Sequence, residues 1–212
     1  MRWGRAALVA LALAAIPAAA APAQTEPAYP QIHYKRCRSL GPPWHGRLVR
    51  GTRLPPEGAD FFTWDPARRR TPNRWWRRYA CDFAIKKVLR VLSSIHRDFP
   101  DAPRIGIGDM SRPRGGGFGP RFGALGHASH QNGVDIDVYY PRLDGLERAP
   151  RDIGDIDLDL AQELVDRFVR AGAQFAFVGP HTGLEGPPKV VQVLANHDDH
   201  VHVRFRVPRS RR

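Results

Sequence analysis

Apolar side chains recur at helical spacing in two stretches of the chain. In the first stretch, lysines and arginines occupy the other faces, and the apolar positions are Cys81, Ala84, Val88, Val91, Leu92 and Ile95. The second stretch begins after a capping residue, Asp157 or Asp159, and ends before Gly172. Its apolar positions are Ala161, Leu164, Val165 and Phe168. The pattern therefore predicts two amphipathic helices, the first of which ends before Pro100.

Four short segments are predicted as strands from their apolar content or their alternation: residues 104–109, 134–140, 174–178 and 200–207. Residues 24–75 are rich in Pro and Gly, show little periodicity, and predict an irregular wrap around a core of residues 77–207. The resulting order of elements has no βαβ succession. It predicts a single α+β domain, residues 24–212, with a small, mainly antiparallel sheet flanked by helices.

The first 23 residues have the pattern of a secretory signal peptide. Arg2 and Arg5 precede an apolar run over residues 6–16, and small residues over 18–23 offer cleavage sites. A membrane-spanning helix needs about 20 apolar residues, and no other stretch of the sequence is long enough. We therefore expect export of the mature domain to the periplasm, the cell wall or the medium, with an uncleaved anchor as the alternative.

Composition and charge exclude some classes of protein. A chain that is 42% hydrophobic and 25% charged is typical of a globular protein rather than a disordered one. The net charge of +12 falls to +10 when two arginines leave with the signal peptide, and it suggests an anionic partner without naming one. A basic and aromatic run over residues 68–79 could bind nucleic acid, but a solvated basic face with tryptophans packed beneath it explains the run better.

Two cysteines are too few for a disulfide scaffold or a Cys-rich zinc site. In an oxidising compartment, Cys37 and Cys81 are expected to pair, which would tie the irregular amino-terminal segment to the first helix. Two buried free thiols are the alternative.

Five of the nine histidines fall in two short windows, each beside or within a predicted strand. On a strand, alternate side chains share a face, so Asp135 and Asp137 would both point away from the core. In the last strand, His200 and His202 share a face for the same reason. If the two strands are neighbours, these four polar groups converge on one face of the sheet.

His130, Asp137 and His202 together offer two imidazoles and one carboxylate, the ligand set of one catalytic Zn²⁺ with an open position. Such a zinc lowers the pKa of its bound water to about 7. His200 is placed to act as the general base. Asp135 could orient one of the metal ligands without itself binding the metal. A closed structural metal site and a polar sheet face without metal are the alternatives.

The two windows resemble those of a known family, the penicillin-insensitive murein endopeptidases. The likeness rests on Gly108-Asp109-Met110-Ser111 with the Gly-rich loop that follows, on His127-Ala-Ser-His130-Gln-Asn-Gly-Val-Asp135-Ile-Asp137, and on His197-Asp-Asp-His200-Val-His202. This family is grouped with lysostaphin-type endopeptidases, D-Ala-D-Ala carboxypeptidases and hedgehog amino-terminal domains, which share a His-x₆-Asp spacing and a distal His-x-His. The likeness covers residues 77–205 and implies a fold of the hedgehog and D,D-peptidase type, with zinc on one sheet face.

The resemblance implies the same zinc ligands and the same base, and it adds His127 and His197 as accessory catalytic residues. The implied substrate is the D-alanyl–diaminopimelyl cross-link of peptidoglycan, hydrolysed by metal-activated water. Ser111, Arg112 and Arg114 of the Gly-rich loop are candidate substrate-binding residues, because an arginine fork suits the carboxylates of a peptide stem. Simple solvation of the loop is the alternative.

Three other functions are weaker predictions. A D,D-carboxypeptidase of the same zinc group would share the core motif. A secreted nuclease would account for the positive charge but would need a phosphate cradle, so no nucleic-acid partner is predicted. A non-catalytic wall-binding module would keep the fold, but the complete set of ligands and base argues against it.

Overall fold

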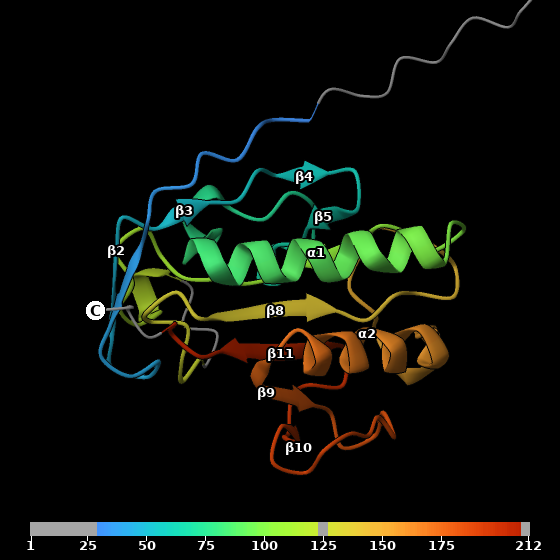
Figure 1. Cartoon of the computed structure of the whole chain (residues 1–212). Coiled ribbons are helices and arrows are strands. Elements are labelled where there is room, and N and C mark those ends of the chain that lie inside the picture. Colours follow the sequence, from blue (N-terminus) through green and yellow to red (C-terminus); the bar gives the residue numbers. More distant parts are fainter. Residues whose placement is uncertain (1–28, 123–126, 209–212) are drawn as a thin grey trace, which may run out of the picture.

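A computed structural model describes residues 29–122 and 127–208, so the predicted signal peptide lies outside the described residues. The chain forms an α+β fold with two α-helices, and its strands lie in two small sheets and one large sheet (Figure 1). The α+β class predicted from the sequence is confirmed. Within the described ranges, no helix is both long enough and apolar enough to cross a membrane.

The large sheet has seven strands, and it is mixed but mainly antiparallel. Its members are β4 (Glu57–Gly58), β5 (Phe61–Thr63), β7 (Ile105–Ile107), β8 (Asp135–Tyr139), β9 (Ala173–Val178), β10 (Val191–Val193) and β11 (His200–Phe205). Their spatial order is β10-β9-β11-β8-β7-β5-β4. The pairs β10 with β9 and β5 with β7 are parallel, and the remaining pairs are antiparallel.

Shorter elements complete the fold. Two small antiparallel sheets pair β1 (Arg38–Leu40) with β2 (Arg47–Val49), and β3 (Thr52–Arg53) with β6 (Tyr79–Ala80). Three 3₁₀ turns, η1 to η3, span Trp75–Arg77, Pro120–Phe122 and Ile153–Asp155.

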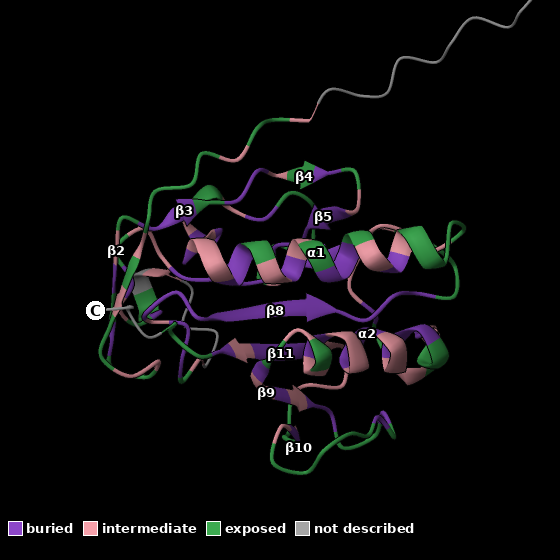
Figure 2. Cartoon of the chain, in the orientation of Figure 1, coloured by how far each residue is buried: buried purple, intermediate pink, exposed green. Residues whose placement is uncertain are grey.

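Both predicted helices are present. α1 (Asp82–Asp98) ends before Pro100, and α2 (Leu158–Arg170) begins after Asp157, whose side chain accepts a hydrogen bond from the backbone nitrogen of Leu160 at 3.0 Å. The two helices lie side by side over one face of the large sheet (Figure 1). Both helices carry buried as well as exposed residues (Figure 2), and the buried ones form one core cluster with apolar residues of β8 and β11. One face of the sheet is therefore committed to the hydrophobic core.

The alternation of β8 and β11 divides their side chains between the two sheet faces. Ile136, Val138, Val201 and Val203 are almost completely buried and belong to the core that includes both helices. By the same alternation, their polar neighbours in sequence point to the opposite face, which neither α1 nor α2 covers (Figure 1). The fold thus leaves this second face free for a functional site.

The irregular wrap expected over residues 24–75 is wrong in one respect, because five short strands, β1 to β5, form there. These strands have only two or three residues each, which is too short for a period-two pattern to be visible in the sequence. β5 also enters the large sheet beside β7, with Phe61 opposite Ile105. The segment is therefore partly an integral layer of the domain and not only a cover.

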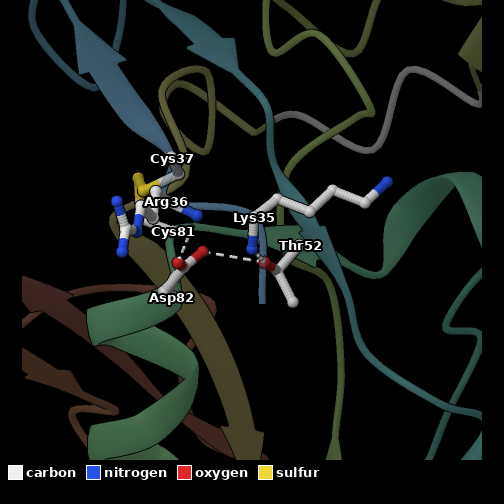
Figure 3. The surroundings of a disulfide bond; sticks show 6 residues. All are labelled: Lys35, Arg36, Cys37, Thr52, Cys81 and Asp82. Atoms are coloured by element: carbon white, nitrogen blue, oxygen red, sulfur yellow. Dashed lines mark hydrogen bonds between the residues drawn. A yellow bond between two sulfur atoms is a disulfide. The ribbon is translucent and has the colours of Figure 1, made fainter. Parts of the chain in front are cut away.

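The predicted disulfide between Cys37 and Cys81 is confirmed, with Cα atoms 5.2 Å apart (Figure 3). It joins the residue before β1 to the residue that caps α1. Next to it, Asp82 Oδ1 accepts a hydrogen bond from Thr52 Oγ1 at 2.7 Å, and Asp82 Oδ2 accepts one from the backbone nitrogen of Arg36 at 2.6 Å. The amino-terminal segment is thus fixed to the start of α1 by one covalent bond and two hydrogen bonds.

Loss of this disulfide is expected to lower the free energy of unfolding. The two cysteines are 44 residues apart, and closing a loop of that length in the unfolded chain corresponds to about 4 kcal/mol. We expect the double variant Cys37→Ala/Cys81→Ala to show this loss in urea unfolding relative to the oxidised wild type. Wild type unfolded in the presence of a reductant serves as the control and should match the variant. Equal stability of all three forms would contradict the prediction.

Candidate metal centre

The two polar windows meet because β8 and β11 are antiparallel neighbours. In their register, His202 lies opposite Asp137, and Arg204 lies opposite Asp135. The backbone pairing therefore places the second histidine of the His-x-His segment directly beside a carboxylate of the other window, on the sheet face that no α-helix covers.

One carboxylate oxygen, Asp137 Oδ1, is the centre of this cluster. It lies 3.3 Å from His130 Nε2, 3.3 Å from His202 Nδ1 and 3.7 Å from His200 Nε2. The other nitrogen of His202, Nε2, is 3.0 Å from Asp135 Oδ1. The structure thus brings together the three predicted zinc ligands and the predicted base, with Asp135 behind His202 as a residue that fixes the orientation of its ring.

His130 reaches the centre from the loop before β8, and its backbone is held in an unusual conformation. Its φ of 65° lies in the left-handed region, which non-glycine residues seldom adopt. Ser111 Oγ donates a hydrogen bond to the carbonyl of His130, and Asp135 Oδ2 accepts one from its backbone nitrogen at 3.2 Å. These two bonds explain how the surrounding structure maintains the conformation. Ser111 is thereby assigned to the support of His130.

His127 is held by a buried ion pair that sequence reasoning missed. Its Nε2 lies 2.7 Å from Asp109 Oδ2, and Asp109 is also bonded to Arg77 and to Asn73 Nδ2, the latter at 3.1 Å. Asp109 and Arg77 are both fully buried. The Gly-Asp-Met-Ser segment did contain Asp109, but nothing in a linear sequence signals that an arginine from another turn neutralises it.

A metal could be held by more than one combination of these groups. Ligand atoms of His127, His130 and Asp137 all lie within 4.8 Å of one another. His202 Nδ1 approaches the same carboxylate. His127, expected only as an accessory residue, is therefore also close enough to act as a ligand.

His200 is oriented by its neighbour in sequence. Asp199 Oδ1 lies 2.6 Å from His200 Nδ1, which leaves Nε2 directed toward Asp137. His197 has its Nδ1 2.8 Å from the carbonyl oxygen of Ala195, and its ring centroid is 4.9 Å from that of His200. With Nδ1 donating to a carboxylate, His200 Nε2 is the basic nitrogen that faces the centre.

Burial and charge act against each other on the ionisable groups of the cluster. Burial lowers the pKa of His130, and it also lowers the pKa of His197. For His202, burial is outweighed by Asp135 and Asp137, which raise its pKa to about 9. Burial alone would raise the pKa of Asp137, but His130 and His200 hold it well below its ordinary value. The carboxylate at the centre is therefore ionised at neutral pH.

Several buried polar atoms at the centre lack hydrogen-bond partners. Among residues 29–122 and 127–208, neither ring nitrogen of His130 makes a hydrogen bond, and neither does Asp137 Oδ1. Leaving such groups unsatisfied in the protein interior costs about 1–3 kcal/mol each. A divalent cation would satisfy Asp137 Oδ1 and the His130 nitrogen that faces it, Nε2, so the donor set fits a metal of the zinc type.

The centre lies in a cleft of about 640 Å³. Its wall includes all five clustered histidines and Asp137, together with Trp44, Tyr139, Arg204 and the segment Leu194–Asn196. A volume of this size admits a few residues of an extended peptide.

The Gly-rich loop does not line this cleft. The guanidinium of Arg112 donates to the carbonyl of Gly115 at 2.8 Å and lies 4.0 Å from the centroid of the Phe122 ring, and Arg114 is exposed outside the cleft wall. Gly115 has a φ of 70°, and a Cβ there would come within 2.0 Å of the carbonyl oxygen of Gln131. Its glycine therefore permits close packing against the loop that carries His130.

The basic run over residues 68–79 is not a uniformly solvated face. Arg77 and Arg78 are buried, the first against Asp109 and the second with its guanidinium donating to the carbonyl of Leu54 at 2.7 Å. The guanidinium carbons of Arg74 and Arg77 lie 4.8 and 5.0 Å from the Trp76 ring centroid. The guanidinium groups of Arg77 and Arg78 are therefore bound within the protein and are not available to a nucleic acid.

Comparison with known proteins agrees with the chemistry of the site. The model of one family, described as penicillin-insensitive murein endopeptidase, matches residues 39–157, more than half of the 212 residues. This match includes His127, His130 and Asp137. No curated protein matches the chain at the threshold applied.

Proposed function

The chain belongs to the penicillin-insensitive murein endopeptidase family, and we propose that it is a zinc-dependent endopeptidase cutting the D-alanyl–diaminopimelyl cross-link of peptidoglycan. Family membership indicates the class of enzyme, which is a peptidase that acts on murein. The convergence of His127, His130 and Asp137 within 4.8 Å supports the metal dependence. We also propose the hedgehog and D,D-peptidase grouping, and export through a signal peptide over residues 1–23.

In this proposal, one Zn²⁺ is held by His130, Asp137 and His202, with His127 as the alternative or additional nitrogen donor. When bound, the ion would polarise the scissile carbonyl and lower the pKa of a water molecule to about 7. Asp135 fixes the ring of His202 through its Nε2, at 3.0 Å, and so keeps Nδ1 directed toward Asp137.

His200 is the proposed general base. Because Asp199 engages Nδ1, the free electron pair of His200 resides on Nε2, which faces the centre of the cluster. This nitrogen takes the proton of the attacking water and afterwards delivers it to the leaving amine. His127 and His197 each have one ring nitrogen bonded to the protein, which leaves the other for the substrate or the metal.

Digestion of purified muropeptides tests the proposal. We expect the mature enzyme, loaded with zinc, to convert a cross-linked muropeptide dimer into monomers and to leave a pentapeptide monomer intact, as followed by mass spectrometry. Because no serine nucleophile takes part, a β-lactam should not slow the reaction. Release of D-Ala from the pentapeptide, with the dimer unchanged, would establish a D,D-carboxypeptidase instead.

A further inference from the structure

The amino-terminal segment contributes an exposed aromatic side chain to the cleft. Trp44 lies in the turn between β1 and β2 and is 61% exposed, yet it forms part of the wall that also contains the histidines. An exposed indole in the wall of a cleft offers a bound ligand a large, rigid apolar surface. Trp44 has no role in the proposed chemistry of the metal.

The turn that carries Trp44 is attached directly to the loop that carries His130. The backbone nitrogen of Gln131 donates to the carbonyl of Pro43 at 2.9 Å, and Asn132 Nδ2 donates to the carbonyl of Gly41 at 2.8 Å. Asn132 is buried. Trp44 is therefore held at a fixed distance from the metal centre rather than on an independent loop.

The Gly-rich loop holds the turn from its other side. The backbone nitrogen of Leu48 donates to the carbonyl of Arg114 at 3.1 Å, and that of Gly116 donates to the carbonyl of Gln131 at 2.9 Å. The strand pair β1–β2, the Gly-rich loop and the His130 loop thus form one hydrogen-bonded unit. Preorganisation of this kind reduces the entropy lost when a ligand is bound.

We propose that Trp44 is a substrate-binding residue, whose indole packs against the apolar parts of the peptide cross-link beside the scissile bond. This inference rests on the proposed function. A cleft of about 640 Å³ holds only the residues next to the bond being cut, so its wall meets methyl and methylene groups of the stem peptides rather than the more distant sugars. The histidines that line the cleft bind through polar atoms, and Trp44 adds a broad, exposed aromatic surface to the apolar side chains of Phe177 and Leu194 in the same wall.

Steady-state kinetics on the soluble muropeptide dimer test this assignment. We expect Trp44→Ala to raise KM about 10-fold with kcat nearly unchanged, because the contact is made equally in the ground state and the transition state. Trp44→Phe should recover most of the loss. The matched control is Trp75→Ala, since Trp75 is 54% exposed but is not part of the cleft wall.

Metal content and thermal unfolding of each variant separate a binding role from a structural one. We expect both to equal those of the wild type in all three variants. An unchanged KM in Trp44→Ala, or an equal rise in Trp75→Ala, would overturn the assignment while leaving the proposed function intact. If wild-type enzyme fails to cut the dimer at all, the proposed function falls and this inference falls with it.

Discussion

Removal of the metal by a chelator is expected to lower the turnover of muropeptide dimer by about 10³-fold or more. Lewis-acid activation is worth several kcal/mol of transition-state stabilisation, and each 1.4 kcal/mol is roughly a factor of ten in rate. The apoprotein should also melt at a lower temperature, because a metal that binds the folded protein stabilises it, and without the metal His130 Nε2 and Asp137 Oδ1 have no hydrogen-bond partner among the described residues.

Reconstitution identifies the ion. Zinc should restore turnover and melting temperature together, whereas magnesium should restore neither, because it prefers all-oxygen sites and binds imidazole poorly. The bound ion can be counted in the reconstituted protein by elemental analysis, with one zinc expected per chain. Full turnover in protein free of any metal would contradict the assignment of the centre.

Replacement of the proposed base should have the second largest effect. We expect His200→Ala to lower kcat by about 10²- to 10⁴-fold, the range typical of a lost general base, with little change in KM. The variant should retain its zinc, because the other three histidines near Asp137 remain. His130 Nε2 and His202 Nδ1 lie 3.3 Å from Asp137 Oδ1, and the ligand atoms of His127 and Asp137 lie within 4.8 Å of each other. The measurements are initial rates on the dimer and metal content per chain.

His181→Ala is a suitable control for this variant. The side chain of His181 is 73% exposed, pairs with Asp198 at 2.8 Å and is not part of the cleft wall. Like His200, it is an imidazole next to an aspartate, but it does not line the cleft. Its replacement should leave kcat unchanged. A His200→Ala enzyme with the same kcat as His181→Ala would show that another group takes the proton.

The elements that the sequence predicts well are those with a long or strict local pattern. α1 and α2 show helical periodicity over several turns, and β8 and β11 alternate strictly enough to assign each side chain to a face. β4, β5 and β10 have two or three residues each, and their place in the sheet depends on distant partners such as the pairing of Phe61 with Ile105. No local pattern encodes such a partner.

The same distinction applies to the site. Asp137, His200 and His202 could be brought together in advance, because strand alternation places them on one face. His130 lies in the loop before β8, and it is predicted from its residue type and from the family resemblance. Asp109 and Trp44 could not be placed in advance, since the first acts through a buried contact with Arg77 and the second reaches the cleft from a turn between two three-residue strands. The Gly-rich loop, predicted to bind substrate, lies outside the cleft wall, and its Gly115 packs closely against the loop that carries His130.

The position of β11 has a consequence for the order in which the molecule assembles. This strand lies between β8 and β9 in the large sheet, although every other strand precedes it along the chain. During synthesis, a gap must remain between β8 and β9 until residues 200–205 become available to fill it. Because the same strand carries His200 and His202, both histidines reach the site only when β11 completes the sheet. If His200 is the base, as proposed, a chain that has not yet added β11 to the sheet lacks its catalytic group and cannot hydrolyse a peptide bond.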